Sequence, residues 1–200
     1  MMLFRLIWML DSIKLEFLND SHVNDVAKLA NNSHISETSG VPPNCSEEIV
    51  KSWVNQNRRD DRSQVHFAIQ TETQTVGCCI LKKMDFANRN AELAYWVGEE
   101  FWGKGIATSA ALLMRDVAFE FFNLEFLHSH YLKINNVASA KILARLGFVP
   151  DNSQSDMPVT DRFARLRPDV WTFVKLHRQK WLDMESTKGW FIQSSSITKS

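Results

Sequence analysis

Gly103-Lys104-Gly105-Ile106-Ala107-Thr108 is the stretch that decides the fold of this chain. It follows a strand-like run at residues 91–97 and opens a long amphipathic run at residues 106–122. Three of the seven glycines, Gly98, Gly103 and Gly105, lie close together here, which indicates positive φ angles or the close approach of another group. Main-chain N–H groups are exposed at such a helix start, where the helix dipole adds positive charge. The stretch therefore predicts a phosphate-binding loop.

The composition excludes several other classes of protein. A chain of 200 residues with 44% apolar content can bury one core, and its zero net charge leaves no basic stripe for a nucleic-acid backbone. No apolar run reaches the ~18 residues of a membrane span, and residues 1–10 are too short for a secretion signal. The three cysteines have no metal-ligand spacing. We therefore expect a cytoplasmic protein without metal, and neither nucleic acid nor membrane as a partner.

Hydrophobic periodicity predicts a mixed α/β chain in which strands and helices alternate after an initial meander. We expect one domain at residues 13–184, a tail at residues 1–12 and a second tail at residues 185–200. The expected strands lie at residues 13–17, 65–69, 75–83, 91–97, 126–132, 148–149 and 170–176. The expected helices begin at Asp20 or Ser21, at Ser46 and at Ile106, and span residues 139–146 and 177–184.

Two motifs in this order resemble the GNAT acyltransferase superfamily. Residues 99–108 look like its motif A, and Asn136-Val137-Ala138-Ser139 with residues 141–148 looks like its motif B. The second motif is similar to the branch that includes the RimJ/RimL ribosomal-protein N-terminal acetyltransferases. The resemblance runs from about Ile13 to Trp181. It implies a GNAT fold, with a mixed, mostly antiparallel sheet flanked by helices and with the fourth and fifth strands splayed apart.

The resemblance also implies acetyl-CoA as co-substrate, with its pyrophosphate at the glycine loop. Three residues of the fourth strand would pair through their main chain with the pantetheine arm, and a lysine in the loop could add a cation. Glu100 departs from the usual Gln or Arg of the motif, and its carboxylate must point outward to leave a phosphate site clear. The expected coenzyme-binding residues are Tyr95, Trp96, Val97, Gly103, Lys104, Gly105, Ile106, Ala107, Thr108 and Asn136.

Direct attack of an amine on a thioester requires a base for the amine proton and a donor for the thioester oxygen. Glu92 is the expected base, because the resemblance implies a glutamate there and because apolar neighbours would raise its pKa. The alternative is a structural glutamate paired with an arginine. The N–H region of Val97 is the expected oxygen donor. Ser139 is the expected acid or thiol contact, or else only a helix cap. Leu143 replaces the tyrosine acid of many members, which leaves Ser139 or water.

The identity of the acceptor amine is left open by the residues. The branch favours a protein N-terminal α-amine. A small amine such as a polyamine, an amino acid or an aminoglycoside is the alternative, and a non-catalytic acyl-CoA-binding module is another. We expect a monomer or a homodimer, and we interpret His128 and His130 as packing residues. A polycationic acceptor needs several acidic residues, for which the candidates are Glu47, Glu48, Asp60, Asp61 and Asp85.

Overall fold

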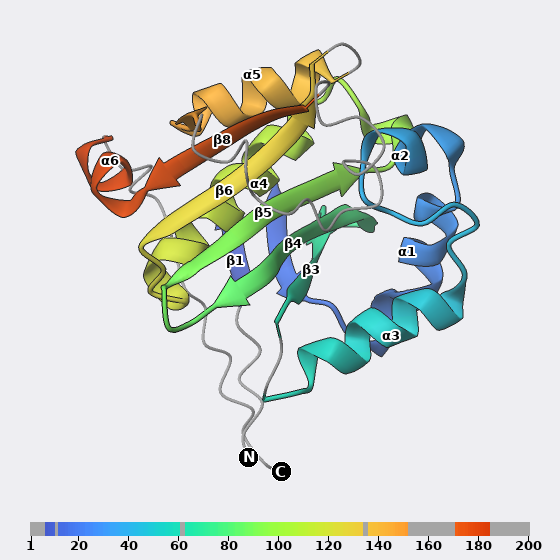
Figure 1. Cartoon of the computed structure of the whole chain (residues 1–200). Helices are drawn as coiled ribbons and strands as arrows, with labels where there is room; N and C mark the ends of the chain where they lie inside the picture. Colours follow the sequence, from blue (N-terminus) through green and yellow to red (C-terminus); the bar gives the residue numbers. More distant parts are fainter. Residues whose placement is uncertain (1–6, 11, 61–62, 134–135, 152–170, 185–200) are drawn as a thin grey trace.

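The computed structural model describes residues 7–10, 12–60, 63–133, 136–151 and 171–184. Eight strands form one sheet in the order β1-β2-β3-β4-β5-β6-β8-β7 (Figure 1). The strands are β1 (Ile7–Leu10), β2 (Ile13–Phe17), β3 (Val65–Gln70), β4 (Thr75–Asp85), β5 (Asn90–Val97), β6 (Phe126–Leu132), β7 (Val149–Pro150) and β8 (Trp171–His177). Every pair is antiparallel except β5 with β6, as expected for the mixed sheet.

Helices cover both faces of this sheet. Three helices gather on one face, at the right of Figure 1, and three pack on the other face. The first group is α1 (Val23–Ala30), α2 (Ser33–Thr38) and α3 (Glu47–Asn57); the second is α4 (Ile106–Asp116), α5 (Val137–Arg145) and α6 (Arg178–Asp183). Single turns precede or follow them at η1 (Asp20–His22), η2 (Glu99–Phe101) and the π-helical η3 (Val117–Phe121).

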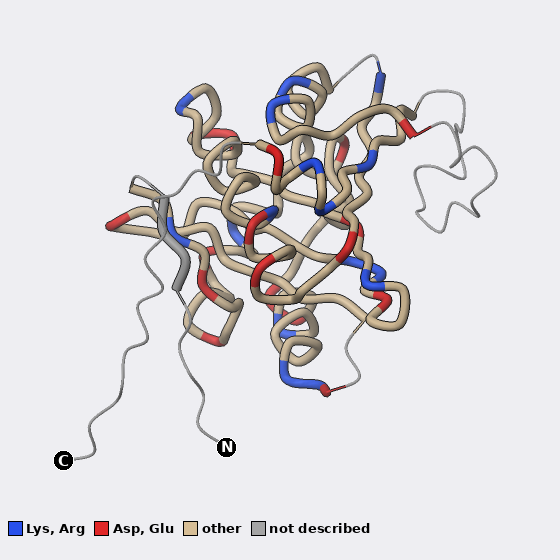
Figure 2. The backbone as a smooth tube through the Cα atoms, turned by 90° about the vertical axis from the view of Figure 1, so that its left-hand side faces the viewer, with Lys and Arg blue, Asp and Glu red and all other residues tan. Residues whose placement is uncertain are grey.

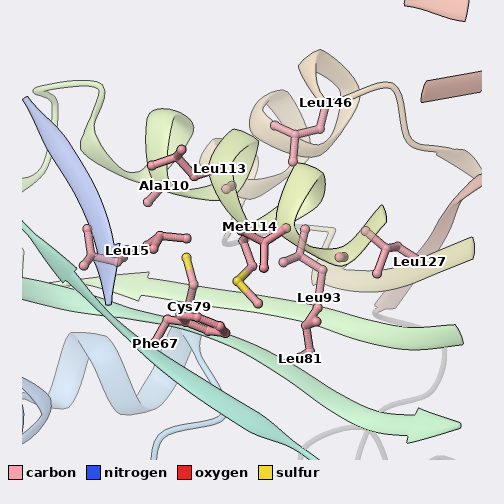
Figure 3. Packing of buried hydrophobic residues seen from close by; sticks show 14 of the residues in the cluster. Leu15, Phe67, Cys79, Leu81, Leu93, Ala110, Leu113, Met114, Leu127 and Leu146 are labelled. Carbon is pink, nitrogen blue, oxygen red and sulfur yellow. The ribbon is translucent and has the colours of Figure 1, made fainter. Parts of the chain in front are cut away.

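The larger core lies between the sheet and α4. Ala110, Leu113 and Met114 recur at helical spacing and point toward the sheet in Figure 3, where they meet strand side chains such as Phe67 and Leu93. All five are buried. Alternation along each strand sends every second side chain to this face, so burial fixes the register of the sheet against α4.

A buried polar cluster fixes α4 relative to the C-terminal helices. The Arg115 side chain donates to the Asp116 carboxylate at 2.7 Å and to the Leu146 carbonyl oxygen at 3.2 Å. The Trp181 indole N–H donates to the same carboxylate at 2.6 Å. Because buried charges are costly unless they are paired, these contacts hold the end of α5 and the whole of α6 in one place against α4.

The parallel strands β5 and β6 separate partway along their length. Their ladder joins only three residue pairs and ends at Glu92 opposite His128. One step further, the Ser129 hydroxyl donates to the Leu93 carbonyl oxygen at 2.8 Å, so a side chain takes over where the main-chain ladder stops. Beyond that point β6 continues against β8 while β5 continues against β4. These are the fourth and fifth strands that we expected to be splayed.

Most expected elements are present, with differences at the N-terminus and after the first helix. Residues 7–10 of the expected tail form β1, which pairs with β2. The structure has α2 before Gly40, where no helix was expected. The long helix from Ile106 leaves regular α geometry after Asp116. Residues 152–170, which include the first residue of the expected strand at 170–176, and the expected C-terminal tail lie outside the described residues.

The distribution of charge agrees with the balanced composition. Lys and Arg alternate with Asp and Glu around the described chain, without a region of a single sign (Figure 2). In the described residues, no helix has the length and apolar character needed to cross a membrane.

Candidate active site

The three glycines before α4 show the two features that the sequence indicated, which are positive φ angles and the close approach of another group. Gly103 and Gly105 have φ angles of +76° and +78°, a region that side chains with a Cβ seldom adopt. Nothing lies within 4 Å of the place where a Cβ would be at either residue. Gly98 instead has a φ of −53°, and a Cβ there would approach Leu29 Cδ2 to 2.8 Å. The loop is therefore bent by glycine while its outer side stays open.

The start of α4 is not capped by a side chain. Gly105 is the N-cap, and its carbonyl oxygen accepts from the N–H groups of Thr108 and Ser109 at 3.0 and 3.1 Å. No residue in the described part of the chain accepts from the N–H groups of Gly105, Ile106 or Ala107. Unpaired N–H groups at the positive end of a helix dipole form a site for an anion.

These residues line a cavity of about 500 Å³, which we call the loop cavity. It runs from the start of α4 to β5, α5 and the end of α2. All but one of the ten residues expected to bind coenzyme line it, the exception being Lys104. Its other lining residues are Ile35, Thr38, Ser39, Phe101, Trp102, Ala138, Ser139, Lys141 and Ile142.

The charged residues of the loop differ from the expectation. The Lys104 ammonium turns back to the Glu100 carbonyl oxygen, at 3.1 Å, and lies over the Phe101 ring. The exposed Glu100 does not line the loop cavity, so its carboxylate does not repel an anion bound there. The cation that lines the cavity is Lys141 on α5, which the sequence analysis did not single out. The sequence signal that could have identified Lys141 was its position one helical turn into the second motif.

The main chain of β5 offers hydrogen-bonding groups to the gap between the strands. The Gly98 N–H donates to the Val76 carbonyl oxygen of β4 at 2.9 Å, and antiparallel pairing alternates from there along the ladder. The N–H and C=O groups of Tyr95 and Val97 therefore point away from β4, and the Val97 carbonyl oxygen accepts from Trp102 Nε1 at 2.7 Å. Trp96 was expected to pair with the pantetheine arm through its main chain. Its main chain instead faces β4, and only its side chain lines the cavities.

Two residues of the second motif connect this gap to α2. The Asn136 side chain caps α5, since its Oδ1 accepts from the Ser139 N–H at 3.1 Å, and its Nδ2 donates to the Thr38 carbonyl oxygen at 3.3 Å. The Ser139 side chain lies at hydrogen-bonding range of the buried Tyr95 hydroxyl. Asn136 is therefore the N-cap, so the expected cap role of Ser139 was wrong. Ser139 lies in the first turn of α5 beside the gap, and its contact with the thiol stays a prediction.

A second cavity of about 510 Å³, which we call the Glu92 cavity, lies on the other side of the gap. Glu92, Lys82, Lys83, His66 and His130 supply its acidic and basic side chains. The two cavities share six lining residues, at the point where β5 leaves β6. The shared residues are Thr38, Ser39, Tyr95, Trp96, Asn136 and Ser139.

Glu92 is buried, with 4% of its surface exposed, but it is paired differently from either expectation. Its Oε2 accepts from Lys83 Nζ at 2.7 Å, and its Oε1 lies 3.8 Å from Lys82 Nζ and 3.9 Å from His130 Nδ1. Burial alone would raise the pKa of Glu92, yet these cations together hold the pKa below its ordinary value. The expected rise in pKa was therefore wrong, and the partners are lysines rather than an arginine.

Several buried polar atoms around the Glu92 cavity have no hydrogen-bond partner in the described part of the chain. They are His66 Nδ1, Trp96 Nε1 and Trp171 Nε1. Buried polar atoms in folded proteins nearly always have partners, so this concentration around one cavity indicates a polar occupant. His66 stacks on Trp53, and burial together with Lys82 lowers its pKa to about 3, so it is neutral at pH 7.

The two histidines of β6 have different surroundings. His130 lines the Glu92 cavity, whereas His128 Nδ1 is buried without a partner in the described chain and burial lowers the pKa of this histidine. Within the described residues, no three His, Cys, Asp or Glu side chains are grouped so that they could hold a metal ion.

The family model described as the acetyltransferase (GNAT) domain matches residues 13–149. The chain therefore belongs to the GNAT acetyltransferase family, a family of acyltransferase enzymes. The "Putative ribosomal N-acetyltransferase YdaF" of Bacillus subtilis is 29% identical over 55% of this chain and 58% of its own length. The spermidine N(1)-acetyltransferase of Escherichia coli K12 is 30% identical over 68% of this chain and 73% of its own length. The chain thus spans less than two thirds of the first of these relatives.

Solved structures have the same fold. A spermidine N-acetyltransferase from Vibrio cholerae, in complex with CoA and spermine, superposes with a TM-score of 0.71 at 19% identity, covering 86% of this chain and 98% of the other. The RimL ribosomal L7/L12 α-N-protein acetyltransferase superposes with a TM-score of 0.70 at 16% identity, covering 87% and 94%. The expected GNAT fold is confirmed, and the relatives include both the expected RimJ/RimL-like branch and spermidine acetyltransferases.

Proposed function

We propose that this protein is an N-acetyltransferase that moves an acetyl group from acetyl-CoA to a protein N-terminal α-amine by direct attack. The observation that carries the proposal is the junction of the loop cavity and the Glu92 cavity where β5 and β6 separate. A donor held on one side and an acceptor held on the other would meet at this junction.

The loop cavity supports binding of the coenzyme. Its unpaired N–H groups at the start of α4 suit a pyrophosphate, and Lys141 adds a positive charge. The outward-facing main chain of Tyr95 and the N–H of Val97 can pair with the amides of a pantetheine arm, much as an added strand would. In this proposal the thioester reaches the junction beside Ser139.

The Glu92 cavity supports activation of the amine. A nitrogen that attacks the thioester carbon must lose a proton, and the ionised carboxylate of Glu92 can accept it, directly or through water. The Val97 N–H would stabilise the oxyanion while the carbon–sulfur bond breaks. The departing thiolate takes a proton from water, or from the Ser139 hydroxyl while water returns a proton to Ser139, and Glu92 then releases the amine proton to solvent. A glutamate that opens into a cavity, as Glu92 does, favours catalysis over a non-catalytic binding module.

The charges of the Glu92 cavity favour a monoamine over a polyamine or an aminoglycoside. Of the acidic candidates, Glu47, Glu48, Asp60 and Asp85 do not line the cavity, and Asp61 lies outside the described residues. Among its described lining residues Glu92 is the only acid, and it stands beside two lysines. A polycation would meet repulsion from these lysines.

An acceptor screen tests the proposal. Acetyl-CoA is mixed with amidated peptides that have free N-termini, with the same peptides acetylated beforehand, and with spermidine and an aminoglycoside, and thiol release is followed. We expect release with the free N-termini alone. Thiol release with spermidine and not with the peptides would contradict the proposed acceptor. If none of the amines tested caused thiol release, acetyl transfer itself would be contradicted.

A further inference from the structure

A bulge at the end of β4 brings two lysines to one carboxylate. The register of β4 against β5 shifts between Lys82 and Asp85, and Lys83 has a φ of +49°, which is unusual for a residue other than glycine. In a regular strand, neighbouring side chains point to opposite faces. Here Lys83 Nζ lies 2.7 Å from Glu92 Oε2, and Lys82 Nζ lies 3.8 Å from Oε1 of the same residue. Bulges that redirect a side chain are frequent next to active sites.

The two lysines leave the Glu92 cavity with more positive than negative charge. Lys83 forms the short ion pair with Glu92. Lys82 makes no hydrogen bond with any residue in the described parts of the chain, and only 22% of its side chain is exposed. His66 beside it is neutral, and His130 stands 3.9 Å from Glu92. One carboxylate therefore faces two ammonium groups in a half-closed space, where their charges are less screened than in water.

We propose that the Lys82 ammonium binds an anionic group of the acceptor, so that the protein acetylates N-termini with an acidic residue at the first or second position. This inference rests on the proposed function, because it places the acceptor amine at Glu92. The carboxylate of a free amino acid would supply the same chemistry, and the experiment below separates the two sources.

The spacing of the two side chains supports this assignment. With Glu92 Oε1 only 3.8 Å from Lys82 Nζ, an amine at the carboxylate and an anion at the ammonium would lie side by side. That arrangement fits one small region of an acceptor that carries both charges. A charge-assisted hydrogen bond is about twice as strong as a neutral one, so the anion would contribute to selection among acceptors. A second cation at the same place would be repelled.

Amidated peptides that differ at one position test the inference. The sequences begin Ser-Glu, Ser-Gln or Ser-Lys, and free glutamate and aspartate form the other arm. With acetyl-CoA, we expect the wild type to prefer the Ser-Glu peptide to the Ser-Lys peptide on the order of tenfold in kcat/KM, which corresponds to about 1.4 kcal/mol. Free acidic amino acids acetylated in preference to every peptide would overturn the assignment to a peptide N-terminus.

Variants identify the residue that is responsible. Lys82→Gln should abolish the preference while the affinity for acetyl-CoA is unchanged, and Lys82→Glu should reverse it toward the Ser-Lys peptide. Lys51→Gln is the control, because Lys51 pairs with Glu47 on the surface of α3 and lines neither cavity. Acetylation of all three peptides without a charge preference, or a preference that survives Lys82→Gln, would overturn this inference alone. Transfer to no acceptor would overturn the proposed function and the inference with it.

Discussion

Replacement of Glu92 by glutamine removes the proposed proton acceptor and keeps the shape of the side chain. The substitution leaves Lys82 and Lys83 without their carboxylate but leaves the loop cavity intact. The loss of a general base typically lowers the rate by about 10² to 10⁴-fold. We therefore expect kcat/KM to fall by about 10²-fold or more, with no change in the dissociation constant of acetyl-CoA.

The same change should have a modest effect on stability. A hydrogen bond to a charged group contributes about 1.5–3 kcal/mol, and we expect the lower end because Lys83, with 43% of its side chain exposed, can turn to water. Since the cations lower the pKa of Glu92 in the folded protein, this stabilisation is present above the unfolded-state pKa of about 4.3 and is lost as the pH falls through the folded-state pKa. Chemical unfolding at neutral and at acidic pH measures both points.

The pH dependence of the reaction gives an independent check. Because Glu92 is already ionised at neutral pH, the rise of kcat/KM with pH should follow the acceptor α-amine, whose pKa is about 8. Glu16→Gln is the matched control, since Glu16 is equally buried, at 3% exposed, and lines neither cavity. The reasoning is refuted when Glu92→Gln turns over as fast as the wild type, or when Glu16→Gln loses as much activity.

Three further changes test the loop, the thiols and the core. Gly105→Val forces a left-handed conformation at about 1–2 kcal/mol and adds a side chain at the open loop, so calorimetry should show much weaker acetyl-CoA binding; wild-type affinity would remove the loop from the site. All three cysteines are buried and unpaired, so they should react with a thiol reagent only after denaturation, and rapid reaction of the native protein would contradict this. Trp181→Phe removes the bond to Asp116 and should lower the free energy of unfolding by about 1–3 kcal/mol; an unchanged midpoint in denaturant would count against the buried cluster.

The parts of the site that depend on main-chain geometry could be predicted from the sequence. Glycines at positions 103 and 105 require a backbone that other residues avoid, and a helical pattern starts directly after them. Strand-like runs lie on both sides of the gap in the sequence, so the order of these elements could be predicted as well. The cap of α5 was expected at Ser139, whereas the structure has it three residues earlier, at Asn136.

The charges of the site depended on features that the sequence pattern does not reveal. Regular alternation would place Lys83 on the face opposite Glu92, and only the bulge brings the two together. Burial raises the pKa of Glu92, but His130, Lys82 and Lys83 together lower it further than burial raises it. The helix α2 was missed because a single residue of it, Ile35, is buried, which leaves no periodic signal. Its last residue Thr38 nevertheless lines both cavities.

The most direct test of the account is a titration of the ¹⁵N-labelled protein with coenzyme A, followed by the amide resonances in NMR spectra. We expect the largest shifts at the N–H groups of Gly105, Ile106 and Ala107, with a second group at Tyr95 and Val97. Saturation by coenzyme A that leaves these five amides unshifted would contradict binding at the start of α4 and between the separated strands.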